Sequence, residues 1–251
     1  MSIVDSFDLH GEEIIKAQNN VKHVADFPQT VISSFSAKFS KLLLAKYDAE
    51  QITELKAGGS SIPVYKINYN NQSLGFYNTV IGGAGAAALL EEIIALGAKK
   101  ILFWGSCGTL DEADGSGRIF IPTAAYRDEG VSYHYAPPSD YIEIESADFL
   151  EKVFGELHIP VSKTKTWTTD AFYRETRRNL ELRKKEGCGV VEMECASLMA
   201  VGQFRKVPVY QFLYSADCIG GNEWDERILG KMPDTLREKI LLIALEAATR
   251  L

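Results

Sequence analysis

Apolar and polar residues recur along the chain at two spacings, every second residue as in strands and every third or fourth residue as in helices. Strand-like runs occupy residues 62–67, 76–81, 99–104, 118–126, 161–167, 189–194 and 207–217. Helical spacing covers residues 86–96, 146–157 and 234–250, and a further helix is predicted to follow residue 194 and to run through Phe204. Because the two kinds of run alternate, the pattern predicts a largely parallel sheet flanked by helices.

The first 57 residues are polar and helical in character. Their apolar positions have the spacing of an amphipathic helix at Phe35, Phe39, Leu42 and Leu43. The sequence GGSS at 58–61 is predicted to break the chain. No internal repeat or low-complexity linker divides the sequence, so we expect one domain spanning residues 1–251.

The charge balance is acidic, with 27 Lys and Arg against 34 Asp and Glu and a net charge of −7. No dense basic run could neutralise a phosphate backbone, which argues against nucleic acid as a partner. The N-terminal residues lack a basic stretch followed by an apolar one, and no window approaches the roughly 18 apolar residues of a membrane span. The sequence therefore predicts a cytoplasmic protein without a membrane partner.

The cysteines do not form a metal-binding pattern. The chain has four, Cys107, Cys188, Cys195 and Cys218, and none belongs to a CxxC pair. It also has four histidines, none of them at a metal-finger spacing. We expect free thiols in a reducing compartment and no bound metal.

A glycine-rich segment, IGGAGAAAL at 81–89, places Gly82, Gly83 and Gly85 between a strand and a helix. Bare backbone amides at a helix N-terminus can hold an anion, but the same glycines can serve only a tight turn and close packing. The segment also reads as GxGxxA. A dinucleotide site needs an acidic residue about 20 positions further on, where this chain reads ILFW, so nicotinamide binding is disfavoured.

A second turn of small residues, GSCG at 105–108, is predicted to follow the strand over 99–104. Ser106 would then lie at the carboxyl end of a strand, where open α/β sheets bind ligands. It is not the GxSxG elbow of hydrolases, and no His or Asp is placed by sequence to activate it. Its hydroxyl suits hydrogen-bond donation to a ligand, and a purely structural role is the alternative.

Three acidic side chains end apolar strands. In VVEMECASL at 190–198, Glu192 and Glu194 would point to one face of an extended chain, where a polyhydroxyl ligand could supply hydrogen-bond donors. Asp217 closes the longest apolar strand, where low-dielectric surroundings would raise its pKa and suit it as a general acid. The alternatives are one exposed and one helix-capping glutamate, and a turn cap for Asp217.

Together these segments resemble the nucleoside phosphorylase and uridine phosphorylase family, which also includes hydrolytic nucleosidases. The resemblance runs from about residue 60 to 220 and is most specific in VVEMECASL, which is similar to the family's V-E-M-E-x-A segment. Supporting matches are GSCG, IPTAAYRDEGVSYHY at 121–135, TTDAFY at 168–173 and YSADCI at 214–219. The resemblance implies a single three-layer α/β domain, with a mixed, largely parallel and twisted central sheet flanked by helices.

The resemblance also implies which residues bind the substrate. Glu194 would hydrogen-bond the ribose 2′ and 3′ hydroxyls, Met193 would pack under the sugar, and Glu192 would line the sugar and base region. Phe172 would lie against the base. The GSCG segment would add Ser106, Cys107 and Gly108 to the substrate site, and the implied phosphate-binding residues are Gly83, Ser106 and Arg127.

In the implied reaction, Asp217 matches the acid that protonates a purine leaving group. Uridine-specific members share a Gln and an Arg shortly after the FY pair, and here these positions read Thr176 and Arg178, which favours a purine. The base would leave an oxocarbenium-like ribosyl centre, and phosphate would attack the anomeric carbon to give ribose 1-phosphate. No metal or organic cofactor is implied, and phosphate is the co-substrate.

The sequence departs from the family at the phosphate. Phosphorylases of this class carry an Arg three residues before the phosphate-contacting Ser or Thr, where this chain has Phe103. Their G-D-P-x-R loop has its nearest counterpart in ADFPQT at 25–30, which lacks both the Gly and the Arg. Loss of two guanidinium groups weakens binding of a dianion. A phosphorylase would therefore have to recruit another cation, with Arg127 and Lys38 as candidates.

Two alternatives stand beside a phosphorylase with a rebuilt phosphate site. A hydrolytic nucleosidase would use water and need no arginines, and a non-catalytic nucleoside-binding protein would keep the pocket without the chemistry. Outside the family, a dehydrogenase would require the missing acidic residue, and a serine hydrolase would require a reactive Ser106.

The resemblance further implies a homo-oligomer built from dimers. A neighbouring chain would complete the sugar pocket through a His and the phosphate site through an Arg. His10 is a candidate for the first of these roles.

Overall fold

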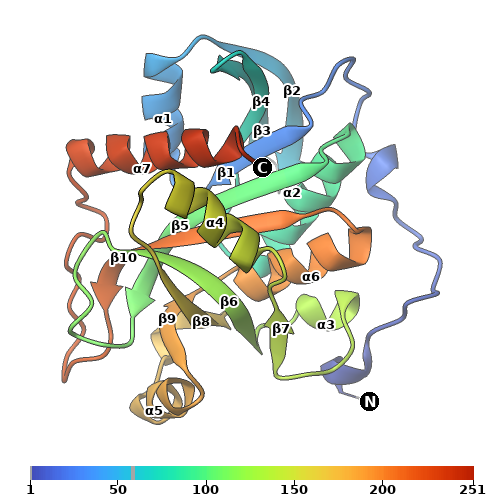
Figure 1. The fold of residues 1–251 in the computed structure, drawn as a ribbon. Coiled ribbons are helices and arrows are strands. Elements are labelled where there is room, and N and C mark those ends of the chain that lie inside the picture. Colours follow the sequence, from blue (N-terminus) through green and yellow to red (C-terminus); the bar gives the residue numbers. More distant parts are fainter. Residues whose placement is uncertain (1, 58–59) are drawn as a thin grey trace.

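The computed structural model describes residues 2–57 and 60–251. In this part of the chain a ten-stranded sheet forms the centre of the molecule (Figure 1). Its strands are β1 (Thr30–Ser34), β2 (Ala49–Ala57), β3 (Ser60–Tyr69), β4 (Gln72–Asn78), β5 (Lys100–Thr109), β6 (Ile119–Asp128), β7 (Tyr141–Glu143), β8 (Ser162–Thr169), β9 (Cys188–Glu192) and β10 (Val209–Cys218). The helices are α1 (Ala37–Lys46), α2 (Gly83–Leu96), α3 (Ser132–Tyr135), α4 (Ala147–Glu156), α5 (Arg177–Lys185), α6 (Cys195–Arg205) and α7 (Asp234–Ala248), with 3₁₀ turns η1 (Ile3–Asp5), η2 (Ala17–Asn19) and η3 (Phe172–Arg174).

The sheet is mixed and has a parallel centre. The strands β4, β1, β5 and β10 pair in parallel, as do β6, β8 and β9. The antiparallel pairs are β2–β3, β3–β4, β5–β9, β6–β7 and β6–β10. Because β10 pairs with both β5 and β6, the strands β10, β6, β8, β9 and β5 close into a ring, from which β1, β4, β3 and β2 extend. The mixed α/β sheet is confirmed, although antiparallel pairs are as frequent as parallel ones among the described strands.

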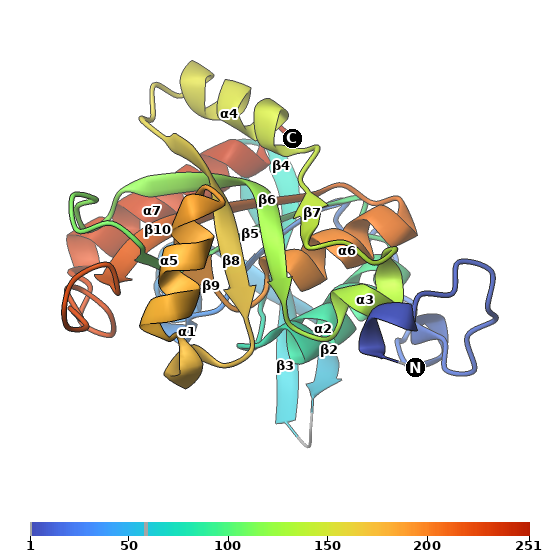
Figure 2. The same ribbon diagram turned by 90° about the horizontal axis from the view of Figure 1, so that it is seen from below.

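Helices cover both faces of the sheet, which gives the expected three layers (Figures 1 and 2). On one face α2 and α3 pack against α6, and on the other face α1 and α4 pack against α7. The N-terminal segment follows the outside of the first group, since η2 contacts α2 and η1 contacts α3. Helix α5 contacts β9 and lies at the edge of the ring.

The strands and helices predicted after residue 62 are present with shifted ends, and the N-terminal prediction was partly wrong. The predicted amphipathic helix is α1, which buries Phe39 and Leu43. The segments Thr30–Ser34 and Ala49–Ala57, however, are strands and not helical. The first is a short buried strand inserted between β4 and β5. Of the predicted break, Gly58 and Gly59 lie outside the described residues, and Ser60 and Ser61 begin β3.

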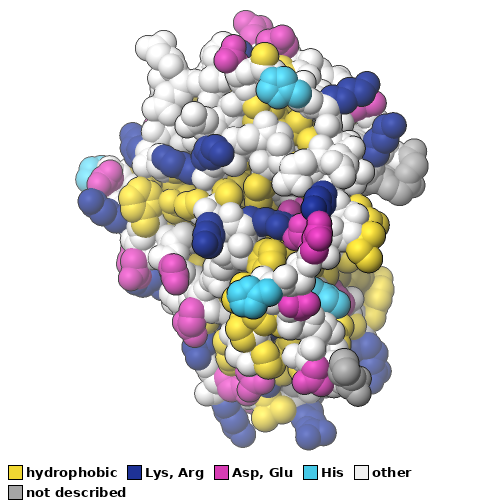
Figure 3. Space-filling model, turned by 90° about the vertical axis from the view of Figure 1, so that its right-hand side faces the viewer, with side chains coloured by type: hydrophobic (Ala, Val, Ile, Leu, Met, Phe, Trp, Pro, Cys, Tyr) yellow, Lys and Arg dark blue, Asp and Glu magenta, His cyan; other side chains and the backbone are white. Residues whose placement is uncertain are grey.

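The surroundings of the cysteines agree with the thiol prediction, since all four are free and buried. In the described part of the chain, no helix is both long enough and apolar enough to cross a membrane. Nor do the described His, Cys, Asp and Glu side chains gather in threes in an arrangement that could hold a metal ion. The face seen in Figure 3 carries basic and acidic side chains intermixed around small hydrophobic patches, so neither charge dominates it.

Candidate active site

A cavity of about 310 Å³ lies where the carboxyl ends of β1, β5, β9 and β10 meet. The parallel strands β1, β5 and β10 bring Ser34, Ser106 and Ala216 to it, and the turn after β9 adds Glu192 to Glu194. The remaining wall comes from residues 35, 36, 38 and 39 around the start of α1, from Ile81, from residues 228–230 and 232, and from Arg237 on α7. The site is therefore built at one edge of the sheet, where this class of fold binds ligands.

Glu192 is a buried carboxyl group that is fully engaged by donors. It accepts hydrogen bonds from Thr168 Oγ1 at 2.5 Å and Thr166 Oγ1 at 3.2 Å, both on β8. The backbone N–H groups of Glu194 and Cys195 also donate to it, each at 2.7 Å. Burial raises the pKa of Glu192, and these hydrogen bonds oppose the rise. Glu192 thus ties β8 to the first turn of α6 and fixes the base of the cavity.

Glu194 is the N-cap residue of α6 and is 6% exposed. Its Oε1 accepts a hydrogen bond from the backbone N–H of Gly82 at 2.7 Å. Burial, followed by the charge of Glu192, raises the pKa of Glu194 to about 8. The chain is not extended here as the sequence suggested, since α6 begins at Cys195, but both glutamates still line the cavity together with Met193.

Ser106 was predicted in a turn and lies instead within β5, which continues through the GSCG segment. It is exposed to the cavity, which the buried Tyr214 on β10 also lines. Successive side chains on a strand point to opposite faces. Cys107 accordingly packs in a core cluster with Phe120, Val190 and Leu213, and the expectation that its side chain contacts the substrate is not supported.

Asp217 follows the cavity residue Ala216 on β10 and is half-buried. Trp224 Nε1 donates a hydrogen bond to its Oδ2 at 2.8 Å. Burial raises the pKa of Asp217, while Trp224 and Arg227 oppose the rise. A Cβ atom added at Gly108 would lie 3.4 Å from Asp217 Oδ1, so the glycine leaves room for this carboxyl group. The raised pKa is the direction that the sequence predicted, but Asp217 is not among the described residues that line the cavity, and its role as general acid stays a prediction.

A second carboxyl group, Glu175, was missed by the sequence analysis. It follows η3, is half-buried, and its pKa is raised to about 7 by burial and then by the charge of Asp217. The sequence carried a weak signal, since Glu175 comes two residues after the FY pair of the TTDAFY match. Phe172, which was expected against the base, begins η3 and is 48% exposed.

Two cations also line the cavity. Lys38, in the first turn of α1, donates to the carbonyl oxygen of Gly230 at 2.6 Å. Arg237 on α7 forms an ion pair with Asp234 and donates to the carbonyl oxygen of Met232 at 2.8 Å. The guanidinium of Arg237 and the Ser106 hydroxyl both lower the pKa of Tyr214, which burial raises to about 12. Lys38 was a candidate from sequence, whereas Arg237 belongs to no motif.

A profile of the Phosphorylase superfamily matches residues 31–246 of the chain. The chain belongs to this superfamily. The purine nucleoside phosphorylase of Plasmodium falciparum is 33% identical over 192 residues, which cover 73% of this chain and 77% of the relative. The fold is similar to that of the Toxoplasma gondii purine nucleoside phosphorylase in complex with immucillin-H (TM-score 0.74, 22% identity, 96% of this chain and 97% of that one) and to that of an AMP nucleosidase from Bacteroides thetaiotaomicron (TM-score 0.69, 20% identity, 91% and 90%).

In this superfamily member, two of the expected phosphate contacts lie elsewhere. Arg127 is 3% exposed and donates to Ser132 Oγ at 2.8 Å and to the carbonyl oxygen of Pro137 at 2.6 Å. Among the described residues that line the cavity, neither Arg127 nor Gly83 is found. Gly83 packs against Ser197, and the adjacent amide of Gly82 is already bonded to Glu194. The prediction that Arg127 and Gly83 hold phosphate is therefore not supported.

In this superfamily member, residues 34–38 at the end of β1 and the start of α1 reach the cavity, and not the segment 25–30 that the sequence gave as the nearest counterpart of the family's phosphate loop. Ser34, Ser36 and Lys38 all line the cavity, whereas residues 25–30 precede or only begin β1. Phe103 is fully buried and packs against the rings of Phe35 and Tyr77, so an aromatic core fills the position of the family's arginine.

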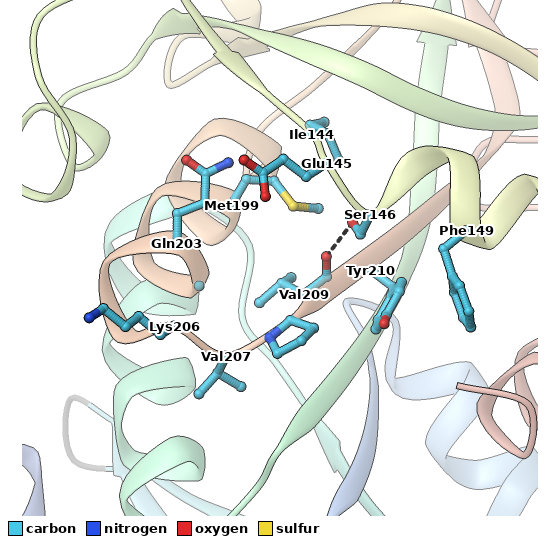
Figure 4. A pocket seen from close by; sticks show the side chains of 12 residues that line it. Ile144, Glu145, Ser146, Phe149, Met199, Gln203, Lys206, Val207, Val209 and Tyr210 are labelled. Atoms are coloured by element: carbon cyan, nitrogen blue, oxygen red, sulfur yellow. Dashed lines mark hydrogen bonds between the residues drawn. The ribbon is translucent and has the colours of Figure 1, made fainter.

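A larger cavity, of about 600 Å³, lies at the other end of β10 (Figure 4). It is lined by the start of α4, the last turns of α6 and the residues that lead into β10. Ser146 Oγ donates to the carbonyl oxygen of Val209 across it at 2.7 Å. Its lining lacks the buried carboxyl groups and the two cations of the smaller cavity. We therefore take the smaller cavity as the candidate active site.

Proposed function

We propose that the chain cleaves the N-glycosidic bond of purine nucleosides by phosphorolysis, giving the free base and ribose 1-phosphate. The observation that carries the proposal is the arrangement of charge around one cavity. The buried carboxyl groups of Glu192 and Glu194 lie at its base, Asp217 lies beside it on β10, and Lys38 and Arg237 line another wall. Sugar, base and phosphate then each have a complementary group.

The sugar is assigned to Glu194 and Met193. A carboxylate inside a cavity requires hydrogen-bond donors, and the vicinal hydroxyls of a ribose supply two of them. Met193 presents an apolar surface to the sugar ring. Glu192, already saturated by four donors, acts in the proposal by holding Glu194 in place.

The base is assigned to the surroundings of Asp217. A carboxyl group of raised pKa can carry a proton near neutral pH and pass it to purine N7 as the glycosidic bond breaks. Thr176, at the position of the Gln in uridine-specific members, is the N-cap of α5, and its side chain accepts a hydrogen bond from Asn179 N. Its hydroxyl is thus used for capping, which favours a purine over a pyrimidine.

Phosphate is assigned to Lys38, Arg237 and Ser106. Two cations and a hydroxyl around one wall of the cavity suit a dianion, and they replace the arginines that the family carries elsewhere. The N-terminus of α1, which carries Lys38, adds the positive end of a helix dipole. Phosphate held there would attack the anomeric carbon as the protonated base leaves, with Glu194 orienting the ribosyl centre.

The superfamily match and the likeness to the Plasmodium falciparum purine nucleoside phosphorylase support this proposal. The likeness to an AMP nucleosidase and the buried Phe103 favour a second candidate, a hydrolytic nucleosidase in which water replaces phosphate. The two differ in what the cations at the cavity do, because only the phosphorylase requires them to bind a dianion.

The direct test is Lys38→Ala, with Lys41→Ala as the matched control on the same helix but outside the cavity. We expect Lys38→Ala to raise KM for phosphate about tenfold or more and to change KM for the nucleoside little, since a charge-assisted contact contributes about 1.5–3 kcal/mol. Lys41→Ala should leave both values unchanged. An unchanged KM for phosphate in Lys38→Ala would exclude this phosphate site.

A further inference from the structure

The segment RDEGVSYHY at 127–135 carries a resemblance to the family but contributes no side chain to the described lining of the candidate active site. It does form a buried polar chain. Arg127, Glu129 and Ser132 are 3%, 8% and 0% exposed, and Ser197 on α6 is 0% exposed. Burying a carboxylate and a guanidinium costs several kcal/mol unless both are hydrogen-bonded, so a chain of this kind calls for a structural or functional explanation.

The carboxylate of Glu129 is the centre of this chain. Its Oε2 accepts from Ser197 Oγ at 2.5 Å and from the backbone N–H of Ser132 at 3.0 Å, and its Oε1 accepts from Ser132 Oγ. Ser132 Oγ in turn accepts from Arg127 Nε at 2.8 Å. The hydroxyl of Ser132 thus bridges Arg127 and Glu129. The guanidinium of Arg127 also donates to carbonyl groups of residues 136–139.

Ser197 connects this hydrogen-bonded network to the carboxylate of Glu194 in two ways. Ser197 lies one helical turn after Glu194, in the first turns of α6. Its hydroxyl also fills the space beside Gly83, where any Cβ atom would clash with it. The neighbouring Gly82, in a backbone conformation of φ 95° that favours glycine, donates its N–H to Glu194 Oε1 at 2.7 Å. Ser197 therefore belongs to the helix that begins after Glu194 and also packs against the turn that donates to Glu194.

We infer that Glu129 is a positioning residue: through Ser197 and the Gly82–Gly83 turn, it holds the carboxylate of Glu194 at the place where ribose hydroxyls bind. The inference rests on the proposed function, because it assigns the hydroxyls of a nucleoside to Glu194. It predicts that the network controls how well the site distinguishes a ribonucleoside from its 2′-deoxy analogue. A network that served folding alone would not affect that ratio.

The test uses three variants of the full chain. Ser197→Ala removes the donor to Glu129 and keeps Gly83 free of a clash. Glu129→Gln replaces an acceptor by an amide NH₂ facing groups that are themselves donors. Ser139→Ala, the control, removes a hydroxyl that accepts a hydrogen bond from Arg127 Nη1 at 3.1 Å, at the exposed end of the same network.

The readout is the ratio of kcat/KM for a purine ribonucleoside to that for the 2′-deoxyribonucleoside with the same base. We expect Ser197→Ala and Glu129→Gln to lower this ratio about fivefold or more, because a hydrogen bond to a misplaced carboxylate loses about 1 kcal/mol, while Ser139→Ala retains the wild-type ratio. Melting temperatures measured in parallel show whether each variant is folded. If Glu129→Gln has lost its fold, the ratio measured for Ser197→Ala alone decides the test.

Equal losses on both substrates in Ser197→Ala, with the ratio unchanged, would overturn the inference, and so would a wild type that shows no preference for the ribonucleoside. A chain that binds nucleosides without releasing base would contradict the proposed function instead. The same ratio, taken from calorimetric dissociation constants of the two nucleosides, would then decide whether the network positions Glu194.

Discussion

At the scale of single residues, Glu194 in the chain without nucleoside keeps its proton at a pH where an exposed glutamate has lost it, since its pKa is about 8 against an ordinary value of 4.5. Below pH 4.5 both the folded and the unfolded chain carry the proton. As pH rises, the unfolded chain ionises first, so the free energy of unfolding falls between about pH 4.5 and pH 8 and levels off above. Stability is lost because the ionised form of Glu194 is buried and lies beside Glu192.

Glu194→Gln should therefore flatten this pH dependence. Relative to the wild type, we expect the variant to gain roughly 1–3 kcal/mol in the free energy of unfolding between pH 5 and pH 8.5, measured by urea denaturation without nucleoside. The amide can still accept from Gly82, so the contact with the turn before α2 is retained. Parallel curves for the two proteins would show that Glu194 is ionised in the folded chain throughout this range.

Asp217→Asn tests the general acid. An asparagine cannot transfer a proton, so kcat/KM for a purine nucleoside should fall about a hundredfold or more. A nucleoside whose N7 is already methylated needs no proton and should be cleaved by the variant at close to the wild-type rate. Glu226→Gln, an exposed acidic neighbour on the loop after β10, serves as the control. Full turnover of the ordinary nucleoside by Asp217→Asn would exclude Asp217 as the acid.

The residues that the sequence could predict are those at the ends of apolar strands. Glu192, Glu194 and Asp217 each interrupt such a run, and a charged residue there is placed by the sheet itself. Arg237 and Glu175 come from a helix and a loop, where charged residues are ordinary, so nothing in their local sequence marked them. Arg127 was misjudged for the same reason, because its partners are backbone carbonyl groups that no sequence pattern reveals.

At the scale of elements, the glycine turn between β4 and α2 and the first turns of α6 depend on each other. Gly83→Ala would drive a Cβ atom into Ser197 Oγ, and we expect a loss of about 1–3 kcal/mol in stability together with weaker nucleoside binding. Gly155→Ala on α4 is the matched control, since nothing lies within 4 Å of its added Cβ atom, and the change should be neutral or stabilising. Thermal melts of both proteins provide the comparison, and equal melting temperatures would contradict this packing.

Long-range contacts explain why two elements were misassigned from the sequence. β2 reads AEQITELKA, rich in residues that favour helices, but it pairs with β3 at the edge of the sheet, where one side remains open to solvent. GSCG resembled a turn, yet β5 continues through it because these residues pair with β10, and Gly108 pairs with β9 as well. In both cases, contacts with distant parts of the chain decide the structure.

At the scale of the whole molecule, the candidate site lies beside exposed apolar side chains. Ile81, which lines the cavity, is 69% exposed, Trp224 beside Asp217 is 59% exposed, and Tyr173 is 89% exposed. Large apolar side chains exposed around a binding site are candidates for an interface with another chain. We predict a homo-oligomer built from dimers, with a mass by light scattering at least twice the 27.8 kDa of this chain.

Tyr173→Ser should weaken this assembly, while Leu242→Ser, which removes an exposed apolar side chain from α7, should not. Sedimentation of the two variants at micromolar concentration measures the difference. A wild-type chain that remains monomeric at that concentration would contradict the prediction.

In the proposed function, the candidate active site binds a purine nucleoside and phosphate together. Its most direct test is the release of free base from a panel of purine and pyrimidine nucleosides, followed by chromatography, with phosphate present and with phosphate rigorously removed. We expect base release from purine nucleosides only when phosphate is present, with ribose 1-phosphate formed in equal amount. Equal release of base without phosphate would contradict it and would make water the nucleophile in this site.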